Sequence, residues 1–112
     1  MARLNYLELP VSDVAASKAF YAAAFDFGFT DFGPDYSATT SGDTDLGLNG
    51  DQSQWTAQVL PVIEVDDLEA VEAKVRAAGG DITVPIFAFP GGRRFHFLDV
   101  AGHELAAMQT EG

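Results

Sequence analysis

The fold is decided most clearly by residues 59–80, which read VLPVIEVDDLEAVEAKVRAAGG. A nearly continuous apolar run opens this stretch and predicts a well-buried β-strand. Asp66 is then placed to cap a helix, with Glu69 three residues further on as in a capping box. Apolar residues follow at helical spacing until Gly79 and Gly80, a pair typical of a helix end. The stretch therefore predicts a strand followed by an amphipathic helix.

The first half of the chain shows the same plan. Leu7 and Leu9 alternate with other residues as in a half-buried strand, and Ser12 or Asp13 is placed to cap a helix. Gly28 is expected to end this helix. Helical spacing places Val14, Lys18, Tyr21 and Phe25 on one face of this helix, as in an amphipathic helix. Further strands are expected at 29–32, 36–40, 46–48, 82–87, 95–98 and 104–108.

Each half therefore reads strand, helix and three shorter strands, which indicates a duplicated module. The fold class expected is α+β, with two βαβββ modules over about residues 1–54 and 55–112. A module of ~55 residues is close to the lower limit for independent folding, so the two are expected to form a single domain.

Composition excludes several classes of function. The chain of 112 residues has 6 Lys and Arg against 17 Asp and Glu, a net charge of −11. Such acidity opposes nucleic-acid binding and docking on anionic membranes. The absence of cysteine excludes disulfides and zinc–thiolate sites. Without a long apolar segment or a secretion signal at the start, a cytoplasmic protein is expected.

Three segments together carry a resemblance to a known superfamily: YLELPVSD at 6–13 leading into AFY at 19–21, VIEVDD at 62–67, and FPGGRRFHFLDVAGHEL at 89–105. In this order and at these separations they resemble the vicinal oxygen chelate superfamily, which includes glyoxalase I, bleomycin-resistance proteins and extradiol dioxygenases. The resemblance implies curved mixed sheets around a cleft, the glyoxalase/bleomycin-resistance fold. It also implies a homodimer.

Metalloenzymes of this superfamily hold a divalent ion with His and Glu from the first and last strand of each module. Carried over to this sequence, those positions fall on Tyr6, on a residue within 46–49, on Leu60 and on Ala106. Leucine and alanine have no lone pair, a neutral tyrosine is a poor ligand, and an open catalytic site needs about three protein ligands. We therefore expect no bound metal and no other cofactor.

Strand alternation places three carboxylates, Glu8, Glu64 and Glu104, on the same faces as the positions named above. They either reach water at strand ends, or one of them pairs with Arg94 or is held protonated by its neighbours. An unusual metal site made by Glu8, Glu104 and His96 is a further alternative. Alone, His96 is either a strand residue with a structural hydrogen bond or a polar group facing the cleft, able to act as a base.

Aromatic side chains near polar segments, above all Tyr36 and Trp55, are candidates for a ligand wall. Arg94 either pairs with a nearby carboxylate or holds an anionic group. No catalytic residue is assigned. The residues expected to contact a ligand are Tyr6, Glu8, Tyr36, Trp55, Leu60, Glu64, Arg94, His96, Glu104, Ala106 and Met108.

The function predicted is binding of a small cationic or aromatic molecule in the cleft without a metal. Bleomycin-resistance relatives sequester a cationic drug in this way, and a net charge of −11 attracts cations. One alternative is a metal-dependent lyase, isomerase or extradiol-type dioxygenase of the same superfamily. Another is a metal-free enzyme in which Glu8, Glu64 or His96 is a general base.

Overall fold

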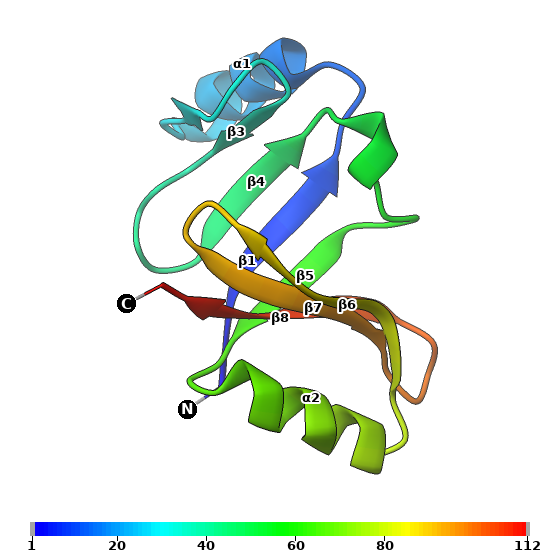
Figure 1. Cartoon of the computed structure of the whole chain (residues 1–112). Coiled ribbons are helices and arrows are strands. Elements are labelled where there is room, and N and C mark those ends of the chain that lie inside the picture. Colours follow the sequence, from blue (N-terminus) through cyan, green and yellow to red (C-terminus); the bar gives the residue numbers. More distant parts are fainter. Residues whose placement is uncertain (1, 112) are drawn as a thin grey trace. The chain divides into compact units, whose positions relative to one another are not determined.

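The computed structural model describes residues 2–111. The first half contains β1 (Arg3–Pro10), α1 (Val14–Phe25), β2 (Thr30–Asp31), β3 (Tyr36–Ala38), β4 (Asp45–Asn49) and the short 3-10 helix η1 (Gln52–Gln54). The second half contains β5 (Leu60–Glu64), α2 (Leu68–Ala77), β6 (Asp81–Phe89), β7 (Gly92–Leu98) and β8 (Glu104–Thr110). The order βαβββ therefore occurs twice (Figure 1), and the α+β fold class predicted from the sequence is confirmed.

Internal contacts divide the chain into two compact units, Tyr6–Leu60 and residues 2–5 with 61–111. In the first unit the strands lie in the order β2-β3-β4-β1. β1 runs parallel to β4, whereas β4 pairs with β3, and β3 with β2, in antiparallel fashion. This register places Glu8 opposite Gly47 and Tyr36 opposite Asn49, so polar residues from three strands meet on one face.

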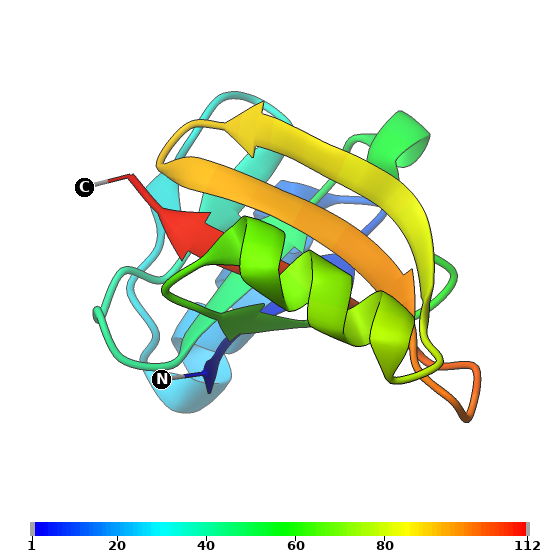
Figure 2. The ribbon, with the colours of Figure 1, turned by 60° about the horizontal axis from the view of Figure 1, so that its bottom comes forward.

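The second unit repeats this mixed arrangement, with the order β5-β8-β7-β6 and β5 parallel to β8. Register shifts in β6 between Ile82 and Val84, and between Val84 and Phe87, interrupt the regular pairing with β7. Bulged strands bend, and Figure 2 shows β6 and β7 as curved strands. His96 on β7 lies opposite Ala106 on β8.

A hydrophobic core forms between α2 and the sheet of the second unit. Val65, Leu68, Phe95 and Ala107 are buried in it, and partly buried side chains such as Phe97 pack around them. Since residues alternate along a strand, Phe95 faces α2 and His96 faces away from it. The face that carries His96 is therefore the face not covered by α2 (Figure 2).

The N-terminus of α2 differs by one residue from the expectation. Asp67, not Asp66, is the cap, because its Oδ1 accepts the Ala70 N–H at 3.1 Å. The Leu68 N–H at the helix start has no acceptor within the helix. It donates instead to Gln109 Oε1 of β8 at 2.9 Å. The helix is thus fastened to the sheet by its own cap and by a strand residue.

The expectation for α1 is confirmed at its N-terminus and wrong at its C-terminus. Asp13 is the N-cap and accepts the Ala16 N–H at 3.0 Å. The helix ends at Phe25, before the expected Gly28, because Asp26 takes the left-handed conformation with φ 61°. Aspartate tolerates this conformation better than most residues, so no glycine is required. Within residues 2–111, no helix has both the length and the apolar character needed to cross a bilayer.

Candidate functional site

Four polar side chains of the first unit, Tyr6, Glu8, Tyr36 and Asn49, form a hydrogen-bonded group that we call the Glu8 cluster. Tyr36 Oη donates to Glu8 Oε2 at 3.0 Å, and Asn49 Nδ2 donates to Glu8 Oε1 at 3.2 Å. The hydroxyls of Tyr6 and Tyr36 are 2.5 Å apart. Since Tyr36 gives its proton to Glu8, Tyr6 is the donor in the bond between the two phenols.

Glu8 is a buried carboxylate, only 5% exposed. A buried charge is costly unless hydrogen bonds satisfy it, and here each carboxylate oxygen has a donor. Burial of the Tyr36 phenol, and secondly the neighbouring Glu8 carboxylate, raises the pKa of Tyr36 above its ordinary value. Tyr36 is therefore a neutral hydrogen-bond donor throughout the physiological pH range.

Gly47 is the residue of β4 that makes the cluster possible. A Cβ atom at this position would collide with the hydroxyls of both Tyr6 and Tyr36. The two phenol oxygens therefore occupy the space that any other residue at position 47 would fill. Position 47 lies within the segment 46–49, where the resemblance places one metal-ligand position. At this residue the strand is covered by the hydroxyls of Tyr6 and Tyr36.

Trp55 lies next to the Glu8 cluster. Its indole Nε1 donates to the Asn49 backbone carbonyl at 2.8 Å, and the Asn49 side chain also accepts from the Asp51 N–H at 2.9 Å. Asn49 therefore connects the carboxylate of Glu8 to the partly exposed Trp55. Composition and spacing do not single out Asn49 or Gly47, because only the strand register brings them beside Glu8.

The second unit has its own polar pair on the face away from α2. His96 is buried, and its Nδ1 lies 3.1 Å from Glu104 Oε2. Thr83 Oγ1 donates to the same carboxylate oxygen at 3.4 Å. A histidine oriented by a carboxylate is the arrangement of a general base, and it is also a common structural pair.

The two adjacent arginines point to opposite faces of β7, as alternation predicts. The Arg94 guanidinium lies 5.3 Å from the centre of the Phe87 ring and 5.6 Å from that of Phe89. Arg93 instead reaches α2, where Nη1 and Nη2 bind the two oxygens of Glu69 at 2.5 and 3.1 Å. Arg93 holds the pKa of Glu69 below its ordinary value.

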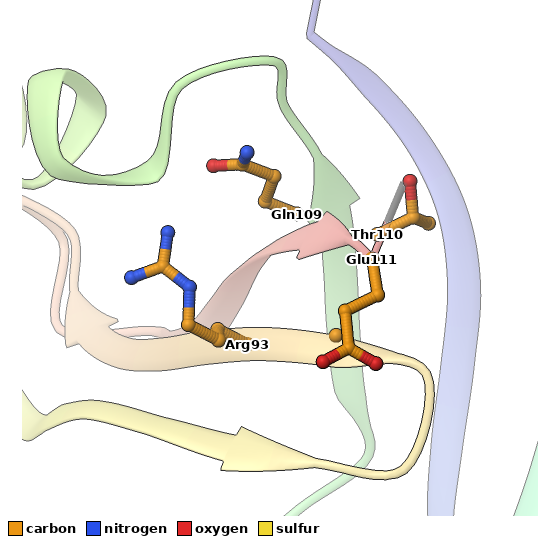
Figure 3. A pocket seen from close by; sticks show the side chains of 5 residues that line it. Arg93, Gln109, Thr110 and Glu111 are labelled. Carbon is orange, nitrogen blue, oxygen red and sulfur yellow. The ribbon is translucent and has the colours of Figure 1, made fainter.

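A pocket of about 220 Å³ lies at the end of β7 and β8 and is lined by Gly92, Arg93, Gln109, Thr110 and Glu111 (Figure 3). Two of its polar side chains have structural roles. Arg93 is paired with Glu69, and Gln109 caps α2.

The remaining ligand-contact candidates lie on β5 and β8. Leu60 and Ala106 are buried apolar residues, and Glu64 lies opposite Met108 with both side chains half-buried. The structure thus groups the candidates by unit. Tyr6, Glu8, Tyr36 and Trp55 come together in the first unit, and Arg94, His96, Glu104, Ala106 and Met108 share neighbouring positions on β7 and β8 of the second.

With the fold and these side chains in place, comparison with known proteins gives a family. The profile of the Glyoxalase/Bleomycin resistance protein/Dioxygenase superfamily matches residues 3–107. The chain belongs to this superfamily. Putative glyoxylases of Mycobacterium bovis and Mycobacterium tuberculosis are each 29% identical over 124 aligned positions. The match covers 95% of this chain and 45% of theirs, so the chain spans about half the length of these curated relatives.

Solved structures with the same fold include a superfamily member from Vibrio splendidus, with a TM-score of 0.72 and 18% identity over 99% of this chain and 100% of that one. Methylmalonyl-CoA epimerase from Mycobacterium tuberculosis has a TM-score of 0.76 and 13% identity over 97% and 88% of the two chains. At these identities the likeness concerns the fold alone.

The positions that correspond to metal ligands in the superfamily do not fit a divalent ion here. Tyr6 is hydrogen-bonded to Tyr36, the segment 46–49 contains no His, Asp or Glu, and the side chains of Leu60 and Ala106 have no donor atoms. Within residues 2–111, no three His, Asp or Glu side chains are arranged to hold a metal ion. Of the three residues in the alternative metal site, Glu8 lies in the first unit, and His96 and Glu104 lie in the second. The donor set, one carboxylate with neutral phenols and an amide, is therefore unlike that of a metalloenzyme.

Proposed function

We propose that this domain binds a small organic cation, carried on or beside an aromatic ring, without a metal. The observation that carries the proposal is the buried Glu8 carboxylate, which Tyr36 and Asn49 hold by hydrogen bonds among aromatic side chains of the first unit. Tyr6 and Tyr36 are half-buried, and Trp55 is partly exposed. These three rings are the groups that would meet the ligand.

The physical basis is the attraction between a cation and the face of an aromatic ring. Such contacts contribute about 0.5–2 kcal/mol each, with tryptophan the strongest partner. The Glu8 carboxylate adds a Coulomb attraction that water screens weakly, because the group is buried. The net charge of −11 would further raise the local concentration of cations around the protein.

Trp55 supplies the readout for a direct test, since it is the single tryptophan of the chain. Its fluorescence is titrated with benzyltrimethylammonium, and in parallel with benzyl alcohol and benzenesulfonate. We expect binding in the order cation, neutral compound, anion. Equal binding of the three compounds, or preference for the sulfonate, would contradict the proposal.

Glu8→Gln tests the role of the carboxylate at nearly constant shape. We expect the affinity for benzyltrimethylammonium to fall about tenfold, and that for benzyl alcohol to stay the same. Glu111→Gln removes one charge from an exposed site and is the matched control. If the two variants lose affinity equally, the effect belongs to net charge and not to the Glu8 cluster.

A second candidate function, metal-free proton transfer, is favoured by the His96–Glu104 pair at 3.1 Å. His96 would be the base and Glu104 the group that orients it. Deuterium incorporation from D₂O into carbonyl compounds with an acidic C–H bond can be followed by NMR in the presence of EDTA. An exchange rate that falls in both His96→Asn and Glu104→Gln would support this candidate. The absence of exchange would leave binding as the function.

Metal analysis of untagged protein tests the third possibility, a metal-dependent enzyme. Because the ligand positions lack donors, we expect less than one divalent ion per chain and no change in thermal stability on dialysis against EDTA. A stoichiometric ion whose removal by EDTA lowers the thermal stability would favour a metal-dependent enzyme over metal-free binding.

A further inference from the structure

The sheet of the first unit has a second face, opposite the Glu8 cluster. Because side chains alternate along a strand, Leu7 and Leu46, which lie opposite each other on β1 and β4, belong to this second face. They border a pocket of about 580 Å³, which we call the Asp26 pocket. It is lined by Leu7, by residues 26–28 and by residues 39–41 and 44–46. All of these residues belong to the first unit, and the Glu8 cluster contributes none of them.

One wall of the Asp26 pocket carries a fixed negative charge, the carboxylate of Asp45. This carboxylate accepts hydrogen bonds from the hydroxyls of Thr39 at 2.7 Å and Ser41 at 2.8 Å, and from the Gly42 N–H at 3.0 Å. Burial of the Asp45 carboxyl raises its pKa, but the hydrogen bonds outweigh burial and hold the pKa below its ordinary value. Asp45 therefore stays ionised, and its oxygens are largely occupied by donors of its own loop.

A second source of negative charge is the C-terminal end of α1, which Asp26 directly follows. The C-terminus of a helix carries a partial negative charge, and a basic residue in the last turn commonly offsets it. The last turn of α1 has no basic residue, and Lys18, the only charged residue of this helix, is paired with Asp31 at 2.8 Å. Among residues 2–111, no hydrogen bond or ion pair engages the Asp26 carboxylate. Asp26 and the helix end therefore repel each other, and a bound cation would relieve this repulsion.

We propose that the Asp26 pocket is a second binding site, which takes the ammonium group of a small aliphatic amine. The ammonium group lies beside Asp26, where its N–H groups donate to the carboxylate and to hydroxyl groups of segment 39–44. The aliphatic chain lies against the apolar part of the lining, which Leu7, Phe27 and Leu46 provide. A volume of about 580 Å³ is within the range of roughly 300–1,000 Å³ that small-molecule sites have.

The test is an NMR titration of the ¹⁵N-labelled chain with hexylammonium, and in parallel with hexyltrimethylammonium, 1-hexanol and hexanoate. We expect affinity to decrease in that order, because only the first compound combines a positive charge with N–H donors. The amides of residues 26–28 and 44–46 should shift. Shifts at Tyr36, Asn49 and Trp55 instead would place the amine at the Glu8 cluster and overturn the proposal. Equal binding of 1-hexanol, or no shift up to about 10 mM amine, would overturn it as well.

Asp26→Asn tests the carboxylate with little change in shape, and asparagine also tolerates the left-handed conformation found at this position. We expect the dissociation constant of hexylammonium to rise about fivefold or more, and that of 1-hexanol to stay the same. Asp81→Asn is the matched control, since it removes the same charge from an exposed residue of the second unit. Equal losses in the two variants would assign the effect to net charge and overturn the proposal.

The apolar part of the site is tested with the series ethyl-, butyl- and hexylammonium. Affinity should increase about twofold to fourfold with each added methylene group, because the chain leaves water as it enters the pocket. Phe27→Ala should weaken this increase. Phe32→Ala is the control, since Phe32 is 57% exposed and does not line the pocket, and circular dichroism verifies that each variant is folded. An affinity independent of chain length, or equal effects of the two phenylalanine variants, would overturn the assignment of an aliphatic amine.

Discussion

The Tyr6 hydroxyl lies 2.5 Å from the Tyr36 hydroxyl, although the two residues are 30 positions apart in the sequence. Their oxygens meet above Gly47, which provides the necessary space. The pair is anchored on Glu8, whose carboxylate accepts a hydrogen bond from Tyr36. This contact forms only when β1, β3 and β4 pair in their register.

Gly47→Ala should destabilise the protein by about 1–3 kcal/mol, because the methyl group would overlap both phenol oxygens. The free energy of unfolding is measured with urea. Gly28→Ala is the control, since a Cβ there meets nothing within 4 Å, and its effect should stay within about 0.5 kcal/mol. Equal effects of the two substitutions would show that the phenols do not fill this space.

Tyr36→Phe should lower the free energy of unfolding by about 1–3 kcal/mol, because it removes a donor to the buried Glu8 carboxylate. It also deprives the Tyr6 hydroxyl of its acceptor. Tyr21→Phe makes the same chemical change where the hydroxyl has no hydrogen bond in the described chain, and it should be nearly neutral. Similar urea midpoints for both variants would argue against the hydrogen-bonded cluster.

Alkaline pH should destabilise the fold through Tyr36. Its pKa in the folded state is raised above the ordinary 10.0, so the stabilisation is complete below about pH 10 and is lost as the pH rises further. Unfolding followed at a series of pH values should therefore show stability falling above about pH 10. In the Tyr36→Phe variant, the free energy of unfolding should decrease less steeply with pH than in the wild type. An equal decrease in both proteins would mean that other groups cause it.

Asp67→Ala should cost about 1 kcal/mol, because the Ala70 N–H would lose its acceptor at the N-terminus of α2. Asp67→Ser retains a capping oxygen, and it should recover most of the loss. The measurement is urea unfolding monitored by the helical circular dichroism signal. An alanine variant as stable as the serine variant would mean that Gln109 alone is sufficient to hold this helix end.

Most of the fold could be predicted from the sequence because its signals are local. The alternation in β1, the apolar run in β5 and the helix caps are each decided by a few neighbouring residues. The errors are local as well. Asp66 and Asp67 are both good caps, and only the backbone conformation decides between them. Asp26 ends α1 without glycine, which a rule based on glycine does not anticipate.

The candidate site could be predicted only in part. Strand alternation places Tyr6 and Glu8 on one face, since successive side chains of a strand point in opposite directions. Their partners Tyr36 and Asn49 come from β3 and β4, and the role of Gly47 depends on which residues lie across from it. Likewise, helical spacing groups Phe25 with Val14, Lys18 and Tyr21, but only packing decides that Phe25 is largely exposed.

The sequence by itself therefore determined the duplicated βαβββ plan, the acidic character and the lack of donor atoms at Leu60 and Ala106, since these follow from residue type and spacing. Only the tertiary structure decided that Glu8 is held by Tyr36 and Asn49, that His96 pairs with Glu104, and that the rings of α1 stay uncovered. The physical reason is that hydrogen bonds and burial depend on distances between strands and helices, which strand register and packing set.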